Sequence, residues 1–309
     1  MNNMSKKKRK LINRNIIISF AVGILFMLLI VLAFNLLKSG QAEFNEEEDL
    51  SRGLNLIFYA DRYESQEAFD NDIIFLMSEL KKREPWGSYN NFNIYKINPM
   101  NEKEICVVET ENLRKPSLRC SEEINNYLQK INVKRFKVIV LSRQEFESWA
   151  NVARLKNSGV FFSVSKRLNK DNSESYGTLF THLIGHAFGL KDEEIYVVAK
   201  SGGAPHTPDG PNCAPDIETA ESWWGDLAKE FIDVGIYKGC CGNKEYIKPA
   251  SNSVMNLNEI RSSDVDYGPV SERYLRNFLK FCFSGKKYSY NDNMDFFERY
   301  PEFKECLND

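Results

Sequence analysis

Histidine is scarce in this chain. Only three of the 309 residues are histidine, so few positions in the chain can supply an imidazole to a catalytic or metal site. The sequence also has no internal repeat and no long low-complexity segment, which excludes a repeat array. Hydrophobic residues make up 42% and charged residues 27% of the chain, so the composition is not that of a disordered protein. A folded domain with a substantial core is therefore expected.

Long apolar runs are rare as well, with one exception near the N-terminus. Ile16 to Leu37 is a stretch of 22 residues without a charge, which is long enough to cross a bilayer as a helix. The alternative is a cleavable signal peptide, because small residues at Gly40 and Ala42 offer a cleavage-like arrangement. The run is longer than a typical signal-peptide core, which favours an uncleaved anchor.

The charges that flank this run are asymmetric. Basic residues precede it at Lys6 to Lys10 and at Arg14, and acidic residues cluster at Glu43 to Asp49. The positive-inside rule then places the N-terminus in the cytoplasm. We expect a cytoplasmic basic segment at residues 1–15, a transmembrane helix at 16–37, an acidic stalk at 38–52 and an extracytoplasmic domain at 53–309.

Positive charge is lacking beyond the first 14 residues. Six of the 41 basic residues lie within residues 1–14, so 35 basic and 43 acidic residues remain, a formal charge of −8. Such a domain has no electrostatic reason to bind nucleic acid. The basic run itself, directly before an apolar span, is typical of a topology signal.

All seven cysteines lie beyond the apolar run, where an extracytoplasmic setting permits disulfides. Cys106 and Cys120 bracket a short segment and are the first candidates for a pair. Because seven is an odd number, at least one cysteine carries a thiol, bonds to another chain or binds a metal. The remaining connectivity stays open.

Strand-like and helix-like patterns alternate through the first half of the domain. Short apolar runs predict strands at Leu54–Tyr59, Phe92–Ile97, Phe136–Leu141 and Val160–Val164. Helical spacing occurs at Phe69–Leu80, at Ile124–Ile131 and, near the C-terminus, at Val270–Phe281. From Ser201 onwards, Gly, Pro, Asn and Cys, including the GCCGN segment, predict irregular loops. The fold class is α/β (α+β), with a cleft between a regular half and a loop-rich half.

Two of the three histidines stand four residues apart in HLIGHAFGLKDEE. On a helix over Tyr176–Phe188, His182 and His186 project from one face and could reach one metal ion. Gly189 can end the helix and return the chain, so that Asp192 follows as a third ligand. This HxxxHxxGxxD spacing favours a metal site over histidines that only pack or face solvent. His206, in a Gly/Pro loop, is expected to be a bystander.

The stretch HLIGHAFGLKDEE resembles the active-site segment of the IgA-peptidase-type zinc metallopeptidases, which are metzincin-like. LNLIFYADRYESQEAFDNDIIFLMSEL is similar to the opening strand, Asp-x-Tyr turn and helix of that family, with Asp61 and Tyr63 at the motif positions. SVMN is similar to the Met-containing turn, with Met255 in place. The resemblance implies a mixed sheet, an active-site helix, a loop-rich C-terminal half, a zinc ion and a polypeptide substrate.

The resemblance departs from the family at two positions. The family segment commonly has one more residue before its Asp-Glu pair, so either Asp192 or Glu193 is the third ligand, and metzincin spacing favours Asp192. Leu183 stands where the family has the Glu of HExxH, the general base. Leucine cannot transfer a proton, and loss of a general base typically costs about 10² to 10⁴ in rate. Glu193 is a possible substitute base.

Three hypotheses follow from these residues. The first is a membrane-anchored zinc metallopeptidase homologue that acts on extracytoplasmic polypeptides and is weak or inactive. The second is a non-catalytic pseudopeptidase of the same fold, which binds zinc or a peptide or protein partner without cutting it. The third is a tethered α/β domain without a metal. Whether the protein is an enzyme, and its oligomeric state, stay open at this point.

Overall fold

The computed structural model describes residues 53–98, 106–109, 117–120, 136–144, 149–150, 161–165, 173–194, 210–256, 265–284, 286 and 288–307. The chain divides into two units, residues 1–48 and 49–309, and every described residue belongs to the second. None of the helices in these ranges is long and apolar enough to cross a membrane. The predicted span Ile16–Leu37 and the segments on either side of it lie outside the described residues.

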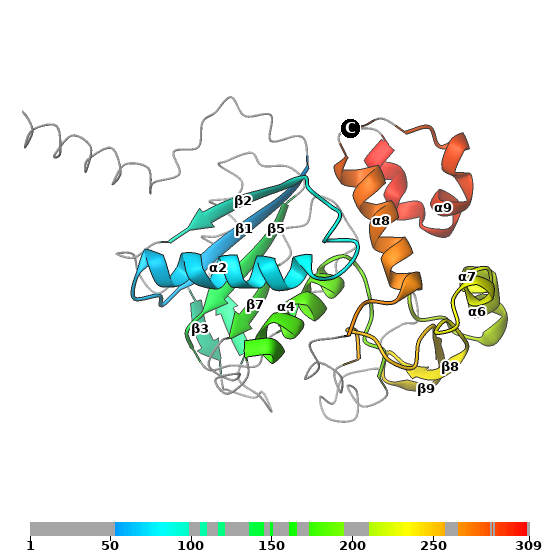
Figure 1. The fold of residues 1–309 in the computed structure, drawn as a ribbon, viewed down its shortest axis with the longest axis horizontal. Coiled ribbons are helices and arrows are strands. Elements are labelled where there is room, and N and C mark those ends of the chain that lie inside the picture. Colours follow the sequence, from blue (N-terminus) through cyan, green and yellow to red (C-terminus); the bar gives the residue numbers. More distant parts are fainter. Residues whose placement is uncertain are drawn as a thin grey trace, which may run out of the picture. The chain divides into compact units, whose positions relative to one another are not determined.

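A five-stranded sheet forms the regular half of the domain (Figure 1). Its order is β2-β1-β5-β7-β6; the first four strands run parallel, and the edge strand β6 is antiparallel to β7. The bounds are β1 Leu54–Asp61, β2 Phe92–Ile97, β5 Phe136–Ser142, β6 Trp149–Ala150 and β7 Phe161–Ser165. All four predicted strands are therefore confirmed to within two residues, and the α/β class with them.

Helices α2 (Gln66–Lys81) and α4 (Ser173–Ala187) pack against the sheet and against each other. Ser65 caps α2 by accepting a hydrogen bond from the backbone N–H of Ala68 at 3.1 Å. The apolar face of α2 enters the same core as Leu56 and Phe58 of β1 and Phe180 of α4. This packing fixes α4, the helix that carries both histidines, on a parallel sheet.

The C-terminal part holds short elements and one long helix (Figure 1). Its bounds are α6 Ile217–Trp224, α7 Leu227–Glu230, β8 Tyr237–Cys240, β9 Asn243–Lys248, α8 Pro269–Phe283, η3 Asn291–Asn293, α9 Met294–Arg299 and η4 Pro301–Leu307. A separate antiparallel pair joins β3 (Cys106–Glu109) to β4 (Ser117–Cys120). Helix α8 confirms the predicted helical spacing, whereas the predicted helical run Ile124–Ile131 lies outside the described residues.

The prediction of an irregular loop at GCCGN is wrong. This segment is the tight turn of the β8–β9 hairpin, with Cys240 paired to Asn243. The two turn residues, Cys241 and Gly242, have φ angles of +54° and +72°. Positive φ at both central residues is what a type I′ hairpin turn requires, and the strand pattern around it is too short to be recognised in the sequence.

Five of the described cysteines are disulfide-bonded. Cys213 is bonded to Cys240, and Cys282 to Cys306. Cys106 is also disulfide-bonded, and Cys120 stands directly opposite it in the β3–β4 register, which agrees with the expected pair. Cys241 is buried and carries a thiol.

Lys137 is an exception within the core. It lies on the central strand β5 with no exposed surface, and its Nζ has no hydrogen-bond partner among the described residues. The ring centroid of Phe188 lies 5.0 Å from Nζ. Burial lowers the pKa of Lys137 to about 7, because the charged ammonium loses its hydration.

We expect Lys137→Met to remove a pH-dependent contribution to stability. Between about pH 7 and pH 10.5, the unfolded chain still holds the lysine proton that the folded chain has released, so wild-type stability should rise with pH. One pKa unit corresponds to ~1.4 kcal/mol, so the rise should amount to a few kcal/mol. Urea unfolding at several pH values measures it, and identical slopes in wild type and Lys137→Met would contradict the assignment.

Candidate metal centre

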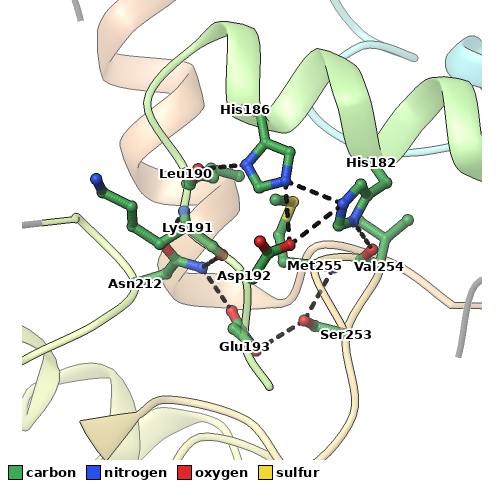
Figure 2. Close-up of polar contacts among 10 residues, drawn as sticks. All are labelled: His182, His186, Leu190, Lys191, Asp192, Glu193, Asn212, Ser253, Val254 and Met255. Carbon is green, nitrogen blue, oxygen red and sulfur yellow. Dashed lines mark hydrogen bonds and ion pairs between the residues drawn. The ribbon is translucent and has the colours of Figure 1, made fainter. Parts of the chain in front are cut away.

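Two imidazoles project from the last two turns of α4 towards the same point (Figure 2). His182 and His186 are nearly buried, with exposed fractions of 2% and 7%. Their Nε2 atoms lie 3.0 Å apart. The i, i+4 spacing on a helix produces this convergence, as the sequence predicted.

The chain reverses directly after α4 and brings Asp192 to the histidines. Gly189 has a φ of +96°, the left-handed conformation that ends a helix, and the N–H of Leu190 bonds back to the carbonyl of Gly185 at 3.0 Å. Asp192 Oδ1 then lies 3.3 Å from His182 Nε2 and 3.1 Å from His186 Nε2. The prediction that Gly189 lets the chain return towards the histidines is therefore confirmed.

The hydrogen bonds of the two Nδ1 atoms determine whether the two Nε2 atoms carry a proton. His182 Nδ1 lies 2.9 Å from the carbonyl oxygen of Val254, and His186 Nδ1 lies 2.9 Å from that of Leu190. A carbonyl only accepts, so both Nδ1 atoms must carry a proton and donate a hydrogen bond. In the neutral rings, both Nε2 atoms then present lone pairs to each other and to a carboxylate oxygen. The two Nε2 atoms and the carboxylate oxygen therefore repel one another unless a positive charge lies among them.

The donor set fits a metal ion. The buried His182 and His186 and the partly buried Asp192 form a group whose ligand atoms could share one ion. Among the described residues, the buried Asp192 Oδ1 has no polar neighbour in these contacts other than the two imidazole nitrogens, which leaves its lone pairs directed at the same point as theirs. Around a tetrahedral zinc with ligand bonds of about 2.0–2.1 Å, donor atoms are ~3.3 Å apart, close to the 3.0–3.3 Å found here. Carbonyl-bound Nδ1 atoms are also the usual outer support of metal-binding histidines.

The close approach of His182, His186 and Asp192 also shifts their pKa values. Burial and the neighbouring His186 lower the pKa of His182. Burial acts on His186 in the same direction, but the negative charge of Asp192 outweighs it and raises the pKa of His186. Burial would raise the pKa of Asp192, yet the two imidazoles hold it well below its usual range. A proton on His186 and a metal ion are therefore alternative sources of positive charge at this point.

Glu193 points away from the imidazoles and anchors the irregular segment that carries Asp192 (Figure 2). Its carboxyl group accepts hydrogen bonds from Asn212 Nδ2 at 2.9 Å and from the Ser253 hydroxyl at 2.7 Å. Its backbone carbonyl accepts from Lys248 Nζ at 2.7 Å. Burial raises the pKa of Glu193 to about 7, although both side-chain hydrogen bonds oppose the rise. Of the two candidate third ligands, the structure brings Asp192, and not Glu193, to the histidines.

The segment 190–194 is held along its length by backbone contacts. The N–H of Glu193 donates to the carbonyl of Met255, and those of Cys241 and Gly242 donate to the carbonyls of Asp192 and Glu194, each at 2.9 Å. Asn212 brackets the backbone of Lys191 with two further 2.9 Å bonds. We call residues 190–194 the ligand segment. Sequence reasoning missed the supporting roles of Asn212 and Lys248, because they come from positions without a diagnostic spacing.

Met255 lies beneath the histidines (Figure 2), where the family resemblance places a methionine turn. It is fully buried, and a side chain at Gly185 would come within 2.5 Å of its sulfur. Gly185, between the two histidines on α4, is therefore what allows the turn to approach the helix. The preceding residue, Val254, supplies the carbonyl that orients His182.

Leu183 is 3% exposed and belongs to the main hydrophobic core. The position at which the resemblance would lead one to expect the HExxH glutamate is thus used for apolar packing. The neighbouring carboxyl group of Glu193 is engaged with Asn212 and Ser253. No carboxyl group beyond that of Asp192 is placed beside the imidazoles by the described contacts.

Several other side chains have contacts of their own that do not involve this centre. Trp224 packs in a small core with Ala214 and Ile247, and Trp223 stacks on the guanidinium of Arg299. Asp61 and Tyr63 bond to Ser142 and Asp72 at the end of β1. His206 lies outside the described residues. A cavity of about 800 Å³ is lined by parts of α6, α8 and α9 and by none of the three metal candidates, so it is not the expected cleft.

Comparisons with models of known protein families and with curated protein sequences find no match to this chain. The case for a metal centre therefore rests on the motif and on the geometry.

We expect Asp192→Asn to weaken zinc binding and Glu193→Gln to leave it largely intact. The first substitution removes an anionic ligand beside both imidazoles; the second resembles the protonated form that a pKa near 7 already makes accessible. Altered support of a metal ligand typically costs about 10–100-fold in affinity, and loss of a ligand should cost at least that much. Titration of the full-length chain with zinc against a competing chelator gives both affinities.

The opposite ranking, with Glu193→Gln the weaker binder, would identify Glu193 as the ligand. His186→Ala serves as the positive control for loss of binding. Thermal unfolding of each metal-free variant shows whether a weak binder is also a poorly folded one.

Proposed function

We propose that this protein is a membrane-anchored homologue of zinc metallopeptidases that has lost hydrolysis and binds extracytoplasmic polypeptide. One observation carries the proposal: three buried lone-pair donors from His182, His186 and Asp192 face one another within 3.3 Å, beside a general-base position filled by Leu183. The three ligands support the proposal that a metal ion binds here. The buried Leu183 supports the proposal that proton transfer has been lost.

Zinc is the ion that this donor set suits best, because two imidazoles and one carboxylate are borderline ligands of the kind found in three-ligand zinc sites. When bound, the ion would act as a Lewis acid for a carbonyl or carboxylate oxygen of a polypeptide. The chain's own residues orient the ligands: Val254 and Leu190 fix the imidazoles, and the ligand segment fixes Asp192.

The extracytoplasmic location is supported by the cysteines. Two disulfides, Cys213–Cys240 and Cys282–Cys306, cross-link the C-terminal part. Stable disulfides are typical of proteins outside the reducing cytoplasm. The proposed anchor at residues 16–37 places the domain there, in agreement with the charge asymmetry of the flanking segments.

The alternative is a weak peptidase in which Glu193 acts as the base. Its pKa of about 7 lies in the range that suits a general base. The orientation argues against this role, because both carboxyl oxygens are engaged by Asn212 and Ser253 on the far side of the ligand segment from the imidazoles. We therefore favour binding over hydrolysis.

The test compares wild type, Leu183→Glu and Leu183→Gln at matched zinc content. Wild type should retain peptides from a mixed library in a zinc-dependent manner without cutting them. Leu183→Glu should hydrolyse them faster than Leu183→Gln by up to about 10² to 10⁴, since only the carboxylate can transfer a proton. Because Leu183 is buried, both variants should lose stability, and rates are compared per folded molecule.

Peptide hydrolysis can be followed by fluorescence dequenching and binding by anisotropy. Zinc-dependent hydrolysis by wild type that disappears in Glu193→Gln would establish the alternative. Absence of any zinc-dependent binding or hydrolysis in all variants would contradict the proposed function.

A further inference from the structure

Three cysteine sulfurs gather on the side of the ligand segment formed by the β8–β9 turn. Cys213 and Cys240 form a disulfide, and Cys241 carries a thiol. The Sγ of Cys241 lies 2.8 Å from the Sγ of Cys213, closer than an ordinary van der Waals contact between two sulfurs. All three residues are at most 1% exposed and form their own small cluster, with Tyr246 against it.

The arrangement gives Cys213 two possible partners. Cys240 and Cys241 are neighbours in the sequence, and the three sulfurs all lie within 4.8 Å of one another. The Sγ of Cys240 lies 3.4 Å from the carbonyl oxygen of Ile247. If Cys240 left the disulfide, its thiol would find a hydrogen-bond acceptor already in place.

We propose that Cys213, Cys240 and Cys241 form a thiol–disulfide exchange site in which Cys213 moves its disulfide between the two neighbouring cysteines. The Cys241 sulfur attacks Cys213 Sγ as a thiolate, and a Cys213–Cys241 bond forms. The Cys213–Cys240 bond breaks, its electron pair stays on the Cys240 sulfur, and that sulfur takes up the proton that Cys241 lost. One disulfide and one thiol are present before and after, so no external oxidant or reductant is consumed.

Burial favours this internal exchange over reaction with external thiols. A dissolved thiol must reach a sulfur to attack it, and these sulfurs are covered. The Cys241 thiol already touches its target. The Cys282–Cys306 disulfide has no third cysteine among its described contacts, which makes it an internal reference within the same chain.

The exchange would act on the ligand segment. The backbone N–H of Cys241 donates to the carbonyl of Asp192, and that of Gly242 to the carbonyl of Glu194. Both donors lie in the tight turn with positive φ angles, so bonding Cys241 instead of Cys240 changes the constraint on this turn. The exchange would thereby tune how firmly Asp192 is positioned, a consequence that rests on the proposed metal function, whereas the exchange itself does not.

The experiment traps the disulfides of the full-length protein. The chain is incubated at neutral pH, quenched in acid, unfolded, alkylated under acidic conditions and mapped by mass spectrometry. We expect alkylated Cys240, paired with a Cys213–Cys241 disulfide, in about 10% or more of the chains, which corresponds to two isomers within about tenfold of each other. Alkylation of Cys282 gives the background.

Two variants fix the two end states. Cys241→Ser should contain only Cys213–Cys240, and Cys240→Ser should form Cys213–Cys241. Alkylation of Cys240 in wild type no higher than the background would overturn the proposal. So would a folded Cys240→Ser in which Cys213 and Cys241 are both alkylated. The wild-type result does not depend on how well either variant folds.

Zinc affinity of the same two variants tests the link to the ligand segment. A difference of several-fold between Cys240→Ser and Cys241→Ser is expected if the turn positions Asp192. Equal zinc affinities would contradict an effect of the exchange on Asp192. The exchange itself is decided by the disulfide mapping. Loss of zinc binding in wild type as well would contradict the metal function instead, so the two failures are distinguishable.

Discussion

Electrostatic repulsion among three lone pairs is the constraint around which the rest of the site is arranged. The carbonyl oxygens of Val254 and Leu190 accept hydrogen bonds from Nδ1 of His182 and His186, which leaves both Nε2 atoms facing the carboxylate of Asp192. Burial removes the water that would otherwise relieve the repulsion. A positive charge must therefore lie among these atoms, either as a proton on His186 or as a metal ion.

The scaffold holds this unfavourable arrangement from several directions. Helix α4 is fixed by the parallel sheet and by α2, and Gly185 admits Met255 close beneath the histidines. The ligand segment is bonded on one side to Met255 and on the other to the β8–β9 turn. The buried Glu193 joins Asn212 to Ser253 across it. A site supported in this way is preorganised to bind an ion. None of the supporting contacts described above requires a group that transfers a proton.

Much of the fold and the centre of the site could be predicted because both depend on local patterns. The strands of the sheet follow from short apolar runs, and the convergence of His182, His186 and Asp192 follows from helical spacing plus a glycine that ends the helix. The supporting contacts could not be predicted, because Asn212 and Lys248 reach Glu193 from distant segments. The hairpin at Cys241 could not be predicted either, since a turn with a cysteine at positive φ lacks the usual Asn-Gly signal. That Leu183 packs in the core likewise emerges only from the tertiary structure.

X-ray absorption spectroscopy of the zinc-loaded protein tests the central claim most directly, because the described part of the chain holds two groups of residues that could bind a metal ion. A zinc ion at His182, His186 and Asp192 predicts only nitrogen and oxygen neighbours at about 2.0–2.2 Å, with the outer-shell scattering typical of two imidazoles. Sulfur neighbours at about 2.3 Å would place the ion at Cys213, Cys240 and Cys241 instead and would contradict the account.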